Sequence, residues 1–447
     1  MRHNPILDAD SYKLSHAKMY PPEVEGLYSY IEPRSVGDEM VFFGLNAWLE
    51  AKRMMLYPND FPGKDSAMGL NGHGLPFDPA DWPLGDLPLK IWAVPEGTVL
   101  PSGLPLVAVE CTDPRYFWLA SYIETSLQRA IWYPTTIASQ GRAAKKLLMK
   151  YAKMTGTDPA FVDFQLHDFG ARGVSSAESA AIGGLAHLVN FKGTDNMLAL
   201  QAAHDFYDEE MAGFSVPASE HSVQCAWGPD RQPQYLEHVI RTFGKPGGIV
   251  SLVLDGYDLD REIDTLCSLA PLVKEIGCKV VFRPDSGDAR RNVLRCLNKA
   301  GDAFGYTRTS TGHMLLNNAA VIQGDGVDME SMREILNAVQ LAGFASGNVV
   351  FGSGGALLQK INRDTYRFAM KASAIKVGDD WLPIYKDPVT DPSKKSKGGR
   401  VAPILTEHGY EVGRIDDPRS IFQLVYDNGE YADPDNLSVI RERCKVE

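Results

Sequence analysis

Six short segments of this 447-residue chain combine acidic residues, arginine and glycine in a pattern that suits a phosphorylated ligand with hydroxyl groups. Each follows a short apolar run that is typical of a β-strand. The segments are HDFGARG (167–173), KGTDN (192–196), DGYD (255–258), RPDSGD (283–288), QGDGVD (323–328) and GSGG (352–355). Carboxylates bind hydroxyls or Mg²⁺, arginine binds phosphate oxygens, and glycine exposes backbone N–H groups.

The glycine-rich segments predict a phosphate-binding site. In FGSGGALLQK a strand-like run ends in glycines and a helix-like run follows, so backbone amides and a helix N-terminus could face an anion. QGDGVD has the same character. The candidate residues are therefore Gly324, Asp325, Gly354 and Gly355. The alternative is that these glycines only form tight turns with positive φ; two such loops at neighbouring strand ends favour phosphate.

The charged residues of these segments divide by position. Asp258 and Asp328 each open a helix-like run and are predicted to be helix N-caps. Asp255 and Asp285 are better placed to face ligand hydroxyls or a Mg²⁺ ion. Arg283 forms either a structural ion pair with Asp285 or a contact with phosphate or a flat ring, and the spacing does not separate these two interpretations.

The elements that must position these residues are predicted to be βα units. From about residue 160 onward, short apolar strands alternate with helical stretches. In one such stretch Met332, Ile335, Leu336 and Val339 fall at i, i+3, i+4 and i+7, which gives a helix with one buried face. In a parallel α/β barrel the carboxyl ends of all strands meet on one face, so the six segments would converge there.

The organisation predicted from the chain is two domains. Residues 1–150 mix short strands with Pro and Gly turns and predict a β-rich α+β domain, joined by the C-terminal segment 401–447. Residues 151–400 predict the α/β barrel.

The bulk composition limits the classes of function. With 44% hydrophobic and 23% charged residues, the chain is typical of a globular protein, and its net charge of −12 argues against general binding of nucleic acid or of a membrane surface. No segment has the length and apolarity of a membrane-spanning helix, and the N-terminus lacks a signal-peptide core. Six scattered cysteines, with no CxxC pair, indicate reduced thiols and a cytoplasmic protein.

A series of sequence motifs, in the same order along the chain, resembles the nicotinamide phosphoribosyltransferase family. The members of this family are type II phosphoribosyltransferases. The motifs are DSYKLSHAKMYPP, YSYIEPRS, VFFGL, PEGTVLPSG, DPRYFWLASYIET, HDFGARGVSSAES, HLVNFKGTDN, SVPASEHS, RPDSGD, VIQGDGVD, FGSGGALLQK and KDPVTDPSKKSKGGR. They run from about residue 4 to residue 400. The resemblance implies an irregular seven-stranded α/β barrel beside a β-rich domain, and a homodimer with shared active sites. The implied reaction joins nicotinamide to 5-phosphoribosyl 1-pyrophosphate, giving nicotinamide mononucleotide and pyrophosphate in NAD salvage.

The resemblance also implies a set of substrate-binding residues. Phe169 would stack on one face of the pyridine ring, and Tyr12 of the partner subunit would stack on the other. Asp195 would accept a hydrogen bond from the carboxamide. The others would line the pyridine pocket (Arg172, Ser251), hold the 5′-phosphate (Gly324, Asp325, Gly354, Gly355) or bind pyrophosphate (Arg34, Arg283, Arg363, Lys371, Lys386).

His221, in SVPASEHS, is implied to be phosphorylated by ATP. The pyridine nitrogen needs no base, so a histidine here would do other chemistry, with Glu220 or Asp255 holding the imidazole. The implied catalytic residues are His221, Asp255, Arg283 and Asp285. ATP is then a coupling substrate, and Mg²⁺ is bound mainly through substrate phosphates, with no set of protein ligands predicted for it.

The chain departs from the family pattern at a few positions. Ala369 and Met370 stand where the family has Ser-Phe before the lysine of Lys371, and Ala171 replaces a frequent aromatic residue, which bears on affinity rather than on the reaction. Three alternatives remain open: a nicotinate-using relative, a phosphosugar isomerase or lyase on a similar barrel, and a non-catalytic ligand-binding protein. A lyase would need a strand-end lysine better placed than Lys192, and a non-catalytic descendant should have lost the Arg, Asp and His set that this chain keeps.

Overall fold

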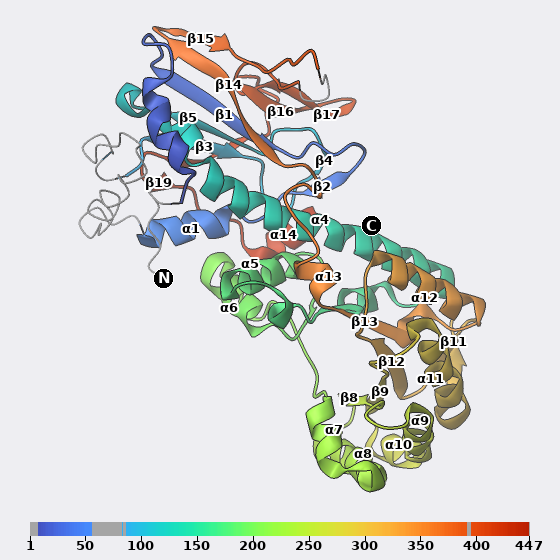
Figure 1. Ribbon diagram of the computed structural model, residues 1–447. Helices are drawn as coiled ribbons and strands as arrows, with labels where there is room; N and C mark the ends of the chain where they lie inside the picture. The colour runs from blue at the N-terminus through green and yellow to red at the C-terminus, as the bar shows by residue number, and fades with distance from the viewer. Residues whose placement is uncertain (1–7, 56–82, 84–85, 391–394, 447) are drawn as a thin grey trace. The chain divides into compact units, whose positions relative to one another are not determined.

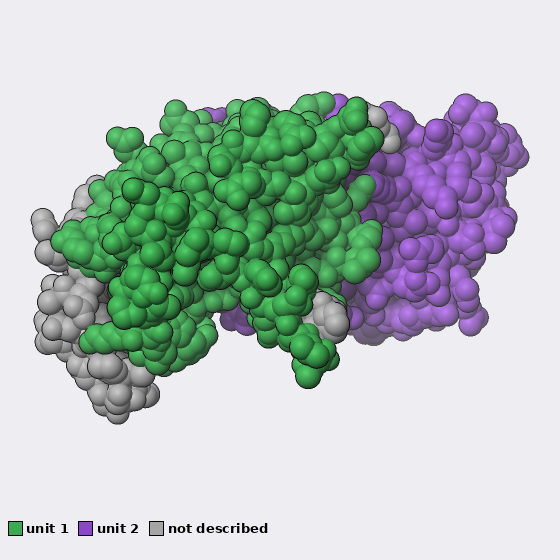
Figure 2. Space-filling model, turned by 90° about the horizontal axis from the view of Figure 1, so that it is seen from above, with its two compact units in different colours: residues 1–139, 206–208, 362–444 green, residues 140–205, 209–361, 445–447 purple. Residues whose placement is uncertain are grey.

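A computed structural model describes residues 8–55, 83, 86–390 and 395–446 of the chain. The chain divides into two compact units, which Figure 2 shows in green and purple. Unit 1 comprises residues 1–139, 206–208 and 362–444, and unit 2 comprises residues 140–205, 209–361 and 445–447.

Unit 1 is built on a seven-stranded antiparallel sheet in the order β15-β14-β1-β5-β3-β18-β19 (Figure 1). The inner strand β1 is buried along its whole length, because successive side chains of a strand point to opposite faces and both faces are covered. Leu27 and Ile31 belong to one hydrophobic cluster, and Tyr28 and Tyr30 belong to another. The strands are β1 Gly26–Glu32, β3 Leu89–Ala93, β5 Val107–Cys111, β14 Ala369–Val377, β15 Asp380–Pro383, β18 Gln423–Asp427 and β19 Glu430–Tyr431.

The remaining elements of unit 1 surround this sheet. Two small antiparallel sheets pair β2 with β4 and β16 with β17. The bounds are η1 Ser11–Lys18, β2 Glu39–Val41, α1 Leu45–Met55, β4 Val99–Pro101, η4 Pro114–Tyr116, α3 Leu119–Tyr122, β16 Val401–Thr406, β17 Gly409–Arg414 and α14 Leu437–Arg443. The long helix α4, Glu124–Thr155, begins in unit 1 and ends in unit 2.

The division between the units differs from the predicted domain boundary in one segment. Residues 401–444 lie in unit 1 together with residues 1–139. Residues 362–400, which the sequence predicts to be part of the barrel, also lie in unit 1. The reason is strand pairing, because β14 pairs with β1 from Gly26↔Lys376 to Glu32↔Ala369.

Unit 2 is built on a parallel sheet of six strands in the order β7-β6-β13-β12-β9-β8. The strands are β6 Leu166–Asp168, β7 Gly193–Thr194, β8 Ile249–Val253, β9 Lys279–Arg283, β12 Ala319–Gln323 and β13 Val349–Ser353. Phe214 forms a parallel bridge with Gly193 of β7, and Ala218 forms one with Ser251 of β8. The segment 214–219 therefore joins the two edges of the sheet as an irregular seventh strand, which agrees with the predicted α/β barrel.

Helices cover the outer face of this sheet, and short elements connect them. They are η5 Pro159–Phe164, η6 Ala171–Gly173, α5 Ala177–Leu188, α6 Met197–Tyr207, α7 His221–Trp227, η7 Pro229–Arg231, α8 Gln232–Phe243, α9 Leu259–Ser268, α10 Ala270–Ile276, α11 Ala289–Phe304, α12 Met329–Leu341, η8 Ser346–Asn348 and α13 Gly355–Leu358, with a ribbon of β10 Tyr306–Arg308 and β11 Met314–Leu316.

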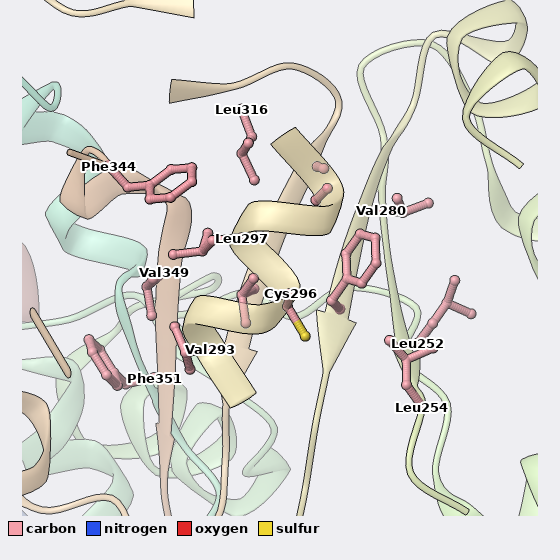
Figure 3. Packing of buried hydrophobic residues seen from close by; sticks show 14 of the residues in the cluster. Leu252, Leu254, Val280, Val293, Cys296, Leu297, Leu316, Phe344, Val349 and Phe351 are labelled. Carbon is pink, nitrogen blue, oxygen red and sulfur yellow. The ribbon is translucent and has the colours of Figure 1, made fainter. Parts of the chain in front are cut away.

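The core of unit 2 lies between the sheet and these helices. Figure 3 shows Val293, Cys296 and Leu297 of α11 at i, i+3 and i+4, packed among side chains of the strands that include Val280 and Phe351. A second, smaller apolar layer contains Val281, Ala320 and Ile322, with Phe169 and Val350 against it. Alternate residues of β9 and β12 thus fill two layers, one under the helices and one inside the barrel.

The local predictions for unit 2 are confirmed. In α12 the buried residues are Met332, Ile335, Leu336 and Val339. Asp258 and Asp328 are helix N-caps whose side chains accept hydrogen bonds from backbone N–H groups of α9 and α12. In the described part of the chain, no helix combines the length and the apolar character that crossing a bilayer requires.

Candidate active site

The carboxyl ends of β6, β9 and β12 meet beside Gly324. A Cβ atom on Gly324 would lie 3.3 Å from Asp285 Oδ1, 3.5 Å from Phe169 Cε2 and 3.8 Å from Arg283 Nε. Parallel pairing of the strands brings their ends to one edge, and so brings together residues more than a hundred positions apart. A ring, a cation and a carboxylate therefore share one small region of unit 2.

The ring of Phe169 rests directly on the backbone of β13. A Cβ atom on Gly352 would lie 2.0 Å from Phe169 Cε2, which only glycine permits. The guanidinium of Arg283 lies 5.6 Å from the centroid of the same ring. The ring of His167 lies 6.1 Å from it, and burial lowers the pKa of His167, although the charge of Asp195 opposes this effect.

A chain of polar contacts runs across the ends of β8 and β9. His221 Nε2 lies 3.2 Å from Asp255 Oδ1, and Asp255 Oδ2 accepts a hydrogen bond from Asp285 N at 3.1 Å. Asp285 in turn pairs with Arg283 at 3.3 Å. Asp255 is 3% exposed while His221 is 46% exposed, so a buried carboxylate holds an accessible imidazole. Glu220 instead accepts a hydrogen bond from Ser222, so Asp255 is the partner of His221.

Asp195 directly follows β7 and is exposed, and one of its carboxylate oxygens accepts a hydrogen bond within the chain. Ser215 Oγ donates to Asp195 Oδ1 at 2.5 Å. Asp195 Oδ2 accepts no hydrogen bond within the part of the chain that the structure describes. Ser251 is buried in β8, where its backbone pairs with Pro217 and Ser219 of the irregular strand.

With one exception, the glycines of the two glycine-rich loops do not have positive φ. Among Gly324, Gly326, Gly352, Gly354 and Gly355, only Gly326 has a positive φ, of 65°. Gly352 is needed because a side chain would meet the ring of Phe169, whereas a Cβ atom at Gly324 would only be in tight contact with Asp285. A Cβ atom added at Gly355 would meet no atom of the described residues within 4 Å, so its backbone is open to approach.

The remaining residues predicted for unit 2 flank these loops. Asp325 is exposed and follows Gly324, and its carbonyl accepts a hydrogen bond from Gln323 at 2.9 Å. Arg172 is exposed on η6 and precedes Gly173. A Cβ atom added to Gly173 would lie 3.7 Å from the backbone N of Gly355. The expected helix after Gly354 is a single turn.

Four predicted phosphate-binding cations gather within unit 1. Burial lowers the pKa of Lys371, and the positive charges of Arg34, Lys386 and Arg363 lower it further, while Glu124 opposes them. Arg34 Nε donates to Glu32 at 2.8 Å, but its buried Nη2 has no partner among the described residues. Arg34 and Lys371 are half-buried, while Arg363 and Lys386 are exposed, so an anion can approach this positively charged group from solvent.

Tyr12 of unit 1 is exposed on η1. Its side chain is 55% exposed, and its ring contacts His16 edge-on at 5.0 Å. The next residue, Lys13, is buried and fixes this helix, because its Nζ pairs with Glu124 at 2.5 Å and donates to Ser121 O at 2.8 Å. The structure thus presents the Tyr12 ring to solvent from a firmly held segment.

The carboxylates of unit 2 suit a Mg²⁺ ion that arrives with phosphate groups. Among the described residues, no cluster of three or more His, Cys, Asp or Glu side chains could hold a metal ion. The side chains of Asp255 and Asp285 already contact His221, the backbone N–H of Asp285 and Arg283. They therefore offer a metal ion individual oxygen lone pairs and not a complete set of ligands. Mg²⁺ commonly binds one or two carboxylates together with substrate phosphates.

Sequence reasoning missed two residues of this site. Gly352, which the sequence places in a phosphate loop, makes room for the ring of Phe169. Ser215, which bonds Asp195, carries no local signal because it lies on the irregular strand, twenty positions away. Both roles depend on contacts between distant parts of the chain.

Comparison with known sequences places the chain in a family. The profile of the nicotinate phosphoribosyltransferase (NAPRTase) family matches residues 164–437, and that of the nicotinamide phosphoribosyltransferase N-terminal domain matches residues 4–55. The chain belongs to the nicotinate phosphoribosyltransferase family.

Relatives and solved structures agree with this assignment. A nicotinamide phosphoribosyltransferase of Xanthomonas campestris pv. campestris is 44% identical over 89% of this chain and 87% of its own length. One of Acinetobacter baylyi is 32% identical over 99% and 97%. The structures of nicotinate-nucleotide pyrophosphorylase from Pyrococcus furiosus (98% and 94% covered) and human nicotinic acid phosphoribosyltransferase (97% and 92%) each share the fold, with a TM-score of 0.61 at 16% identity.

Proposed function

We propose that this chain is a nicotinamide phosphoribosyltransferase, which condenses nicotinamide with 5-phosphoribosyl 1-pyrophosphate to form nicotinamide mononucleotide and pyrophosphate in NAD salvage. Relatives with this name match most of the chain. The observation that carries the proposal is the ring of Phe169, seated on Gly352 and flanked by Arg283 and Asp285 at one edge of the barrel. A flat ring beside a cation and a carboxylate suits a flat base and a charged sugar.

The chemistry requires positioning more than proton transfer. The ring nitrogen of nicotinamide attacks C1 of the ribose with its lone pair, and the bond from C1 to pyrophosphate breaks, so that pyrophosphate leaves with the electron pair. No proton moves. The site must orient the flat base, neutralise the leaving group and tolerate positive charge on the ribose.

The base is held by the residues at the ends of β6 and β7. Phe169 stacks on one face of the pyridine ring, and Tyr12 of the partner subunit covers the other. Asp195 Oδ2 accepts a hydrogen bond from the carboxamide NH₂, while Ser215 holds the other carboxylate oxygen. Arg172 and Ser251 line the same pocket. A carboxylate on the base would face Asp195 with like charge, so nicotinamide is preferred over nicotinate.

The phosphates are held by two groups of residues. The glycine loops (Gly324, Asp325, Gly354, Gly355) bind the 5′-phosphate through backbone N–H groups. Arg283 binds the pyrophosphate, together with the cations that gather around Lys371 in unit 1, which are Arg34, Arg363 and Lys386. Nη2 of Arg34 is buried and has no hydrogen-bond partner in the part of the chain that the structure describes, which supports an anion at this position. Mg²⁺ comes with the phosphates and offsets their charge.

The reaction is coupled to ATP through His221. When Nε2–H of His221 donates to Asp255, Nδ1 carries the lone pair. Nδ1 attacks the γ-phosphorus of ATP, the bond to the bridging oxygen breaks, and ADP leaves, which gives a phosphohistidine. The added negative charge attracts Mg²⁺ and thereby favours binding of 5-phosphoribosyl 1-pyrophosphate.

We further propose that the active enzyme is a homodimer in the cytoplasm, with Tyr12 and the unit 1 cations acting in the site of the neighbouring subunit. Six free cysteines suit a reducing compartment.

One experiment tests the proposed function. The purified protein is given 5-phosphoribosyl 1-pyrophosphate with either nicotinamide or nicotinate, with and without ATP, and mononucleotide is measured by chromatography. Formation of nicotinamide mononucleotide supports the proposal. Formation of only the nicotinate product would favour the second candidate, nicotinate phosphoribosyltransferase, which the name of the matching family profile suggests. Absence of both products would overturn the proposal.

A further inference from the structure

Asp168, the last residue of β6, is a carboxylate with no exposed surface. Its Oδ1 accepts a hydrogen bond from Gly170 N at 2.7 Å, and its Oδ2 accepts one from Asn196 Nδ2 at 2.9 Å. Among the described residues both partners of this side chain are neutral groups, and no cation pairs with it. Burying a polar group is costly unless it is hydrogen-bonded, and here each side-chain oxygen of Asp168 accepts a hydrogen bond.

Asp168 bonds both neighbouring loops. Its side chain holds Gly170, directly after Phe169, and its backbone oxygen accepts a hydrogen bond from Asp195 N at 3.1 Å. Asn196, directly after Asp195, is 2% exposed, and its side chain donates a hydrogen bond to the Asp168 carboxylate. The two residues proposed to recognise the base, Phe169 and Asp195, are thus each adjacent to a hydrogen bond made by Asp168.

Asn196 is itself oriented from a third element. Its Nδ2 donates to Asp168 and also to Ala180 O of α5 at 2.8 Å, so both of its amide hydrogens are used. Because both partners are acceptors, the amide cannot flip without losing both bonds. The pair is therefore a rigid link between β6, the loop after β7 and α5.

Helix α5 contains a glycine where the pair needs space. A Cβ atom on Gly184 would lie 2.4 Å from Asn196 Nδ2 and 2.8 Å from Asp168 Oδ2. The φ of Gly184 is not positive, so the backbone conformation does not require glycine. Glycine is unfavourable inside a helix, and its presence here is explained by the Asp168–Asn196 pair together with Ala199, whose Cβ would lie 2.6 Å from the added atom.

We infer that Asp168 and Asn196 are positioning residues that set the loop of Phe169 relative to the loop of Asp195, and so set the fit of the base. This inference rests on the proposed function. It predicts that weakening the pair impairs use of the pyridine base, while binding of 5-phosphoribosyl 1-pyrophosphate, which the glycine loops and cations carry, is largely kept.

The test compares two buried asparagines of unit 2. Asn196→Ala removes the link at the site. Asn348→Ala is the matched control, because Asn348 is 1% exposed and donates to Met314 O and Ala345 O at 2.8 and 2.9 Å, but precedes β13, at the amino end of the sheet. Asn196→Ala removes the hydrogen bonds to Asp168 and Ala180, and the KM for nicotinamide should rise by roughly tenfold or more. The KM for 5-phosphoribosyl 1-pyrophosphate should change less than about twofold.

A second variant keeps both hydrogen-bonding groups. Gly184→Ala adds a methyl group that would meet Asn196, Asp168 and also Ala199 of α6, and it should raise the KM for nicotinamide in the same selective way. Asn348→Ala should lower the midpoint temperature of thermal unfolding. It should not raise the KM for nicotinamide relative to the KM for 5-phosphoribosyl 1-pyrophosphate. An unchanged KM for nicotinamide in Asn196→Ala and Gly184→Ala, or a parallel rise of both KM values, would overturn the inference.

Hydrogen exchange separates this inference from the proposed function. In Asn196→Ala the amides of Gly170 and Asp195, both bonded to Asp168, should exchange faster than in wild type, without any substrate present. If wild type makes no mononucleotide but these amides do exchange faster, the proposed function fails while the positioning link stands. If the exchange is unchanged, the link itself is wrong.

Discussion

His221 and Asp255 face each other across 3.2 Å, although they are 34 positions apart in the chain. Because Asp255 is buried and His221 is accessible, the carboxylate orients the imidazole, which in the proposed function attacks ATP. In His221→Ala we expect loss of ATP hydrolysis and of the stimulation by ATP, with slow ATP-independent synthesis of mononucleotide remaining. Phosphate release and mononucleotide are measured in parallel.

The control for this prediction is His313→Ala. His313 contacts Thr311 near the ribbon of β10 and β11, so its loss should leave ATP hydrolysis unchanged. Wild type incubated with γ-labelled ATP should carry acid-labile label, and His221→Ala should not. Continued ATP hydrolysis by His221→Ala would contradict the role given to this residue.

Gly352→Ala should impair use of the base. The new Cβ would lie 2.0 Å from Phe169 Cε2, so the ring must move off β13. We expect the KM for nicotinamide to rise by roughly tenfold or more, since a displaced stacking partner loses contact with the base. Gly301→Ala in α11 is the control, because its nearest neighbour would lie at 3.7 Å, and alanine should stabilise this helix. Normal kinetics in Gly352→Ala would show that the ring position does not matter.

Asp195→Ser should change the choice of base. Wild type is expected to favour nicotinamide strongly, because a carboxylate on the base would stand against Asp195. In the variant the ratio of kcat/KM for nicotinamide to that for nicotinate should fall by roughly tenfold or more. Ser215→Ala, which removes only the bond to Asp195 Oδ1, should shift the ratio less. If this ratio of kcat/KM values is the same in wild type and in Asp195→Ser, the prediction is wrong.

Two inactive chains should complement each other. Tyr12 lies in unit 1 and Asp285 in unit 2, and the proposal places Tyr12 in the site of the neighbouring subunit. Co-expressed Tyr12→Ala and Asp285→Ala chains should therefore regain activity in one site of each heterodimer. The mixed species is isolated with two different affinity tags and assayed. If the isolated heterodimer stays inactive, the sites are not shared between subunits.

Glu96 should make the stability of the protein depend on pH. Burial raises the pKa of Glu96 from 4.5 to about 7, despite hydrogen bonds from Gly44 N, Asn46 N and the hydroxyl of Tyr207. The folded state therefore holds the proton more tightly than the unfolded state. This contribution is fully present below pH 4.5, falls as the pH rises, and is lost above about pH 7, with a total on the order of 3 kcal/mol.

Glu96→Gln should remove this dependence from unit 1. The free energy of unfolding, measured with urea at several pH values, should fall less between pH 4.5 and 7 than in wild type. Burial also raises the pKa of Glu262 in unit 2 to about 7, so Glu262→Gln should flatten the same window separately. The same slope in Glu96→Gln and wild type would mean that Glu96 does not titrate in this range.

Local features of this protein could be predicted from the sequence. The buried face of α12 follows from the spacing of Met332, Ile335, Leu336 and Val339, and the caps at Asp258 and Asp328 follow from their positions before helices. Such features depend on neighbours within a few residues. The strand endings also predicted that Phe169, Asp285 and Gly324 would lie close together, because parallel strands end at a common edge.

Other features depended on contacts between distant residues, which the sequence does not specify. Only the tertiary structure decided that Asp255 rather than Glu220 holds His221, that Gly352 serves Phe169, and that the segment 214–219 closes the barrel. The same holds for residues 362–400, which join unit 1 through the pairing of β14 with β1. Periodicity shows which residues of an element are buried, but the partner that buries them is chosen by packing and strand pairing across the whole chain.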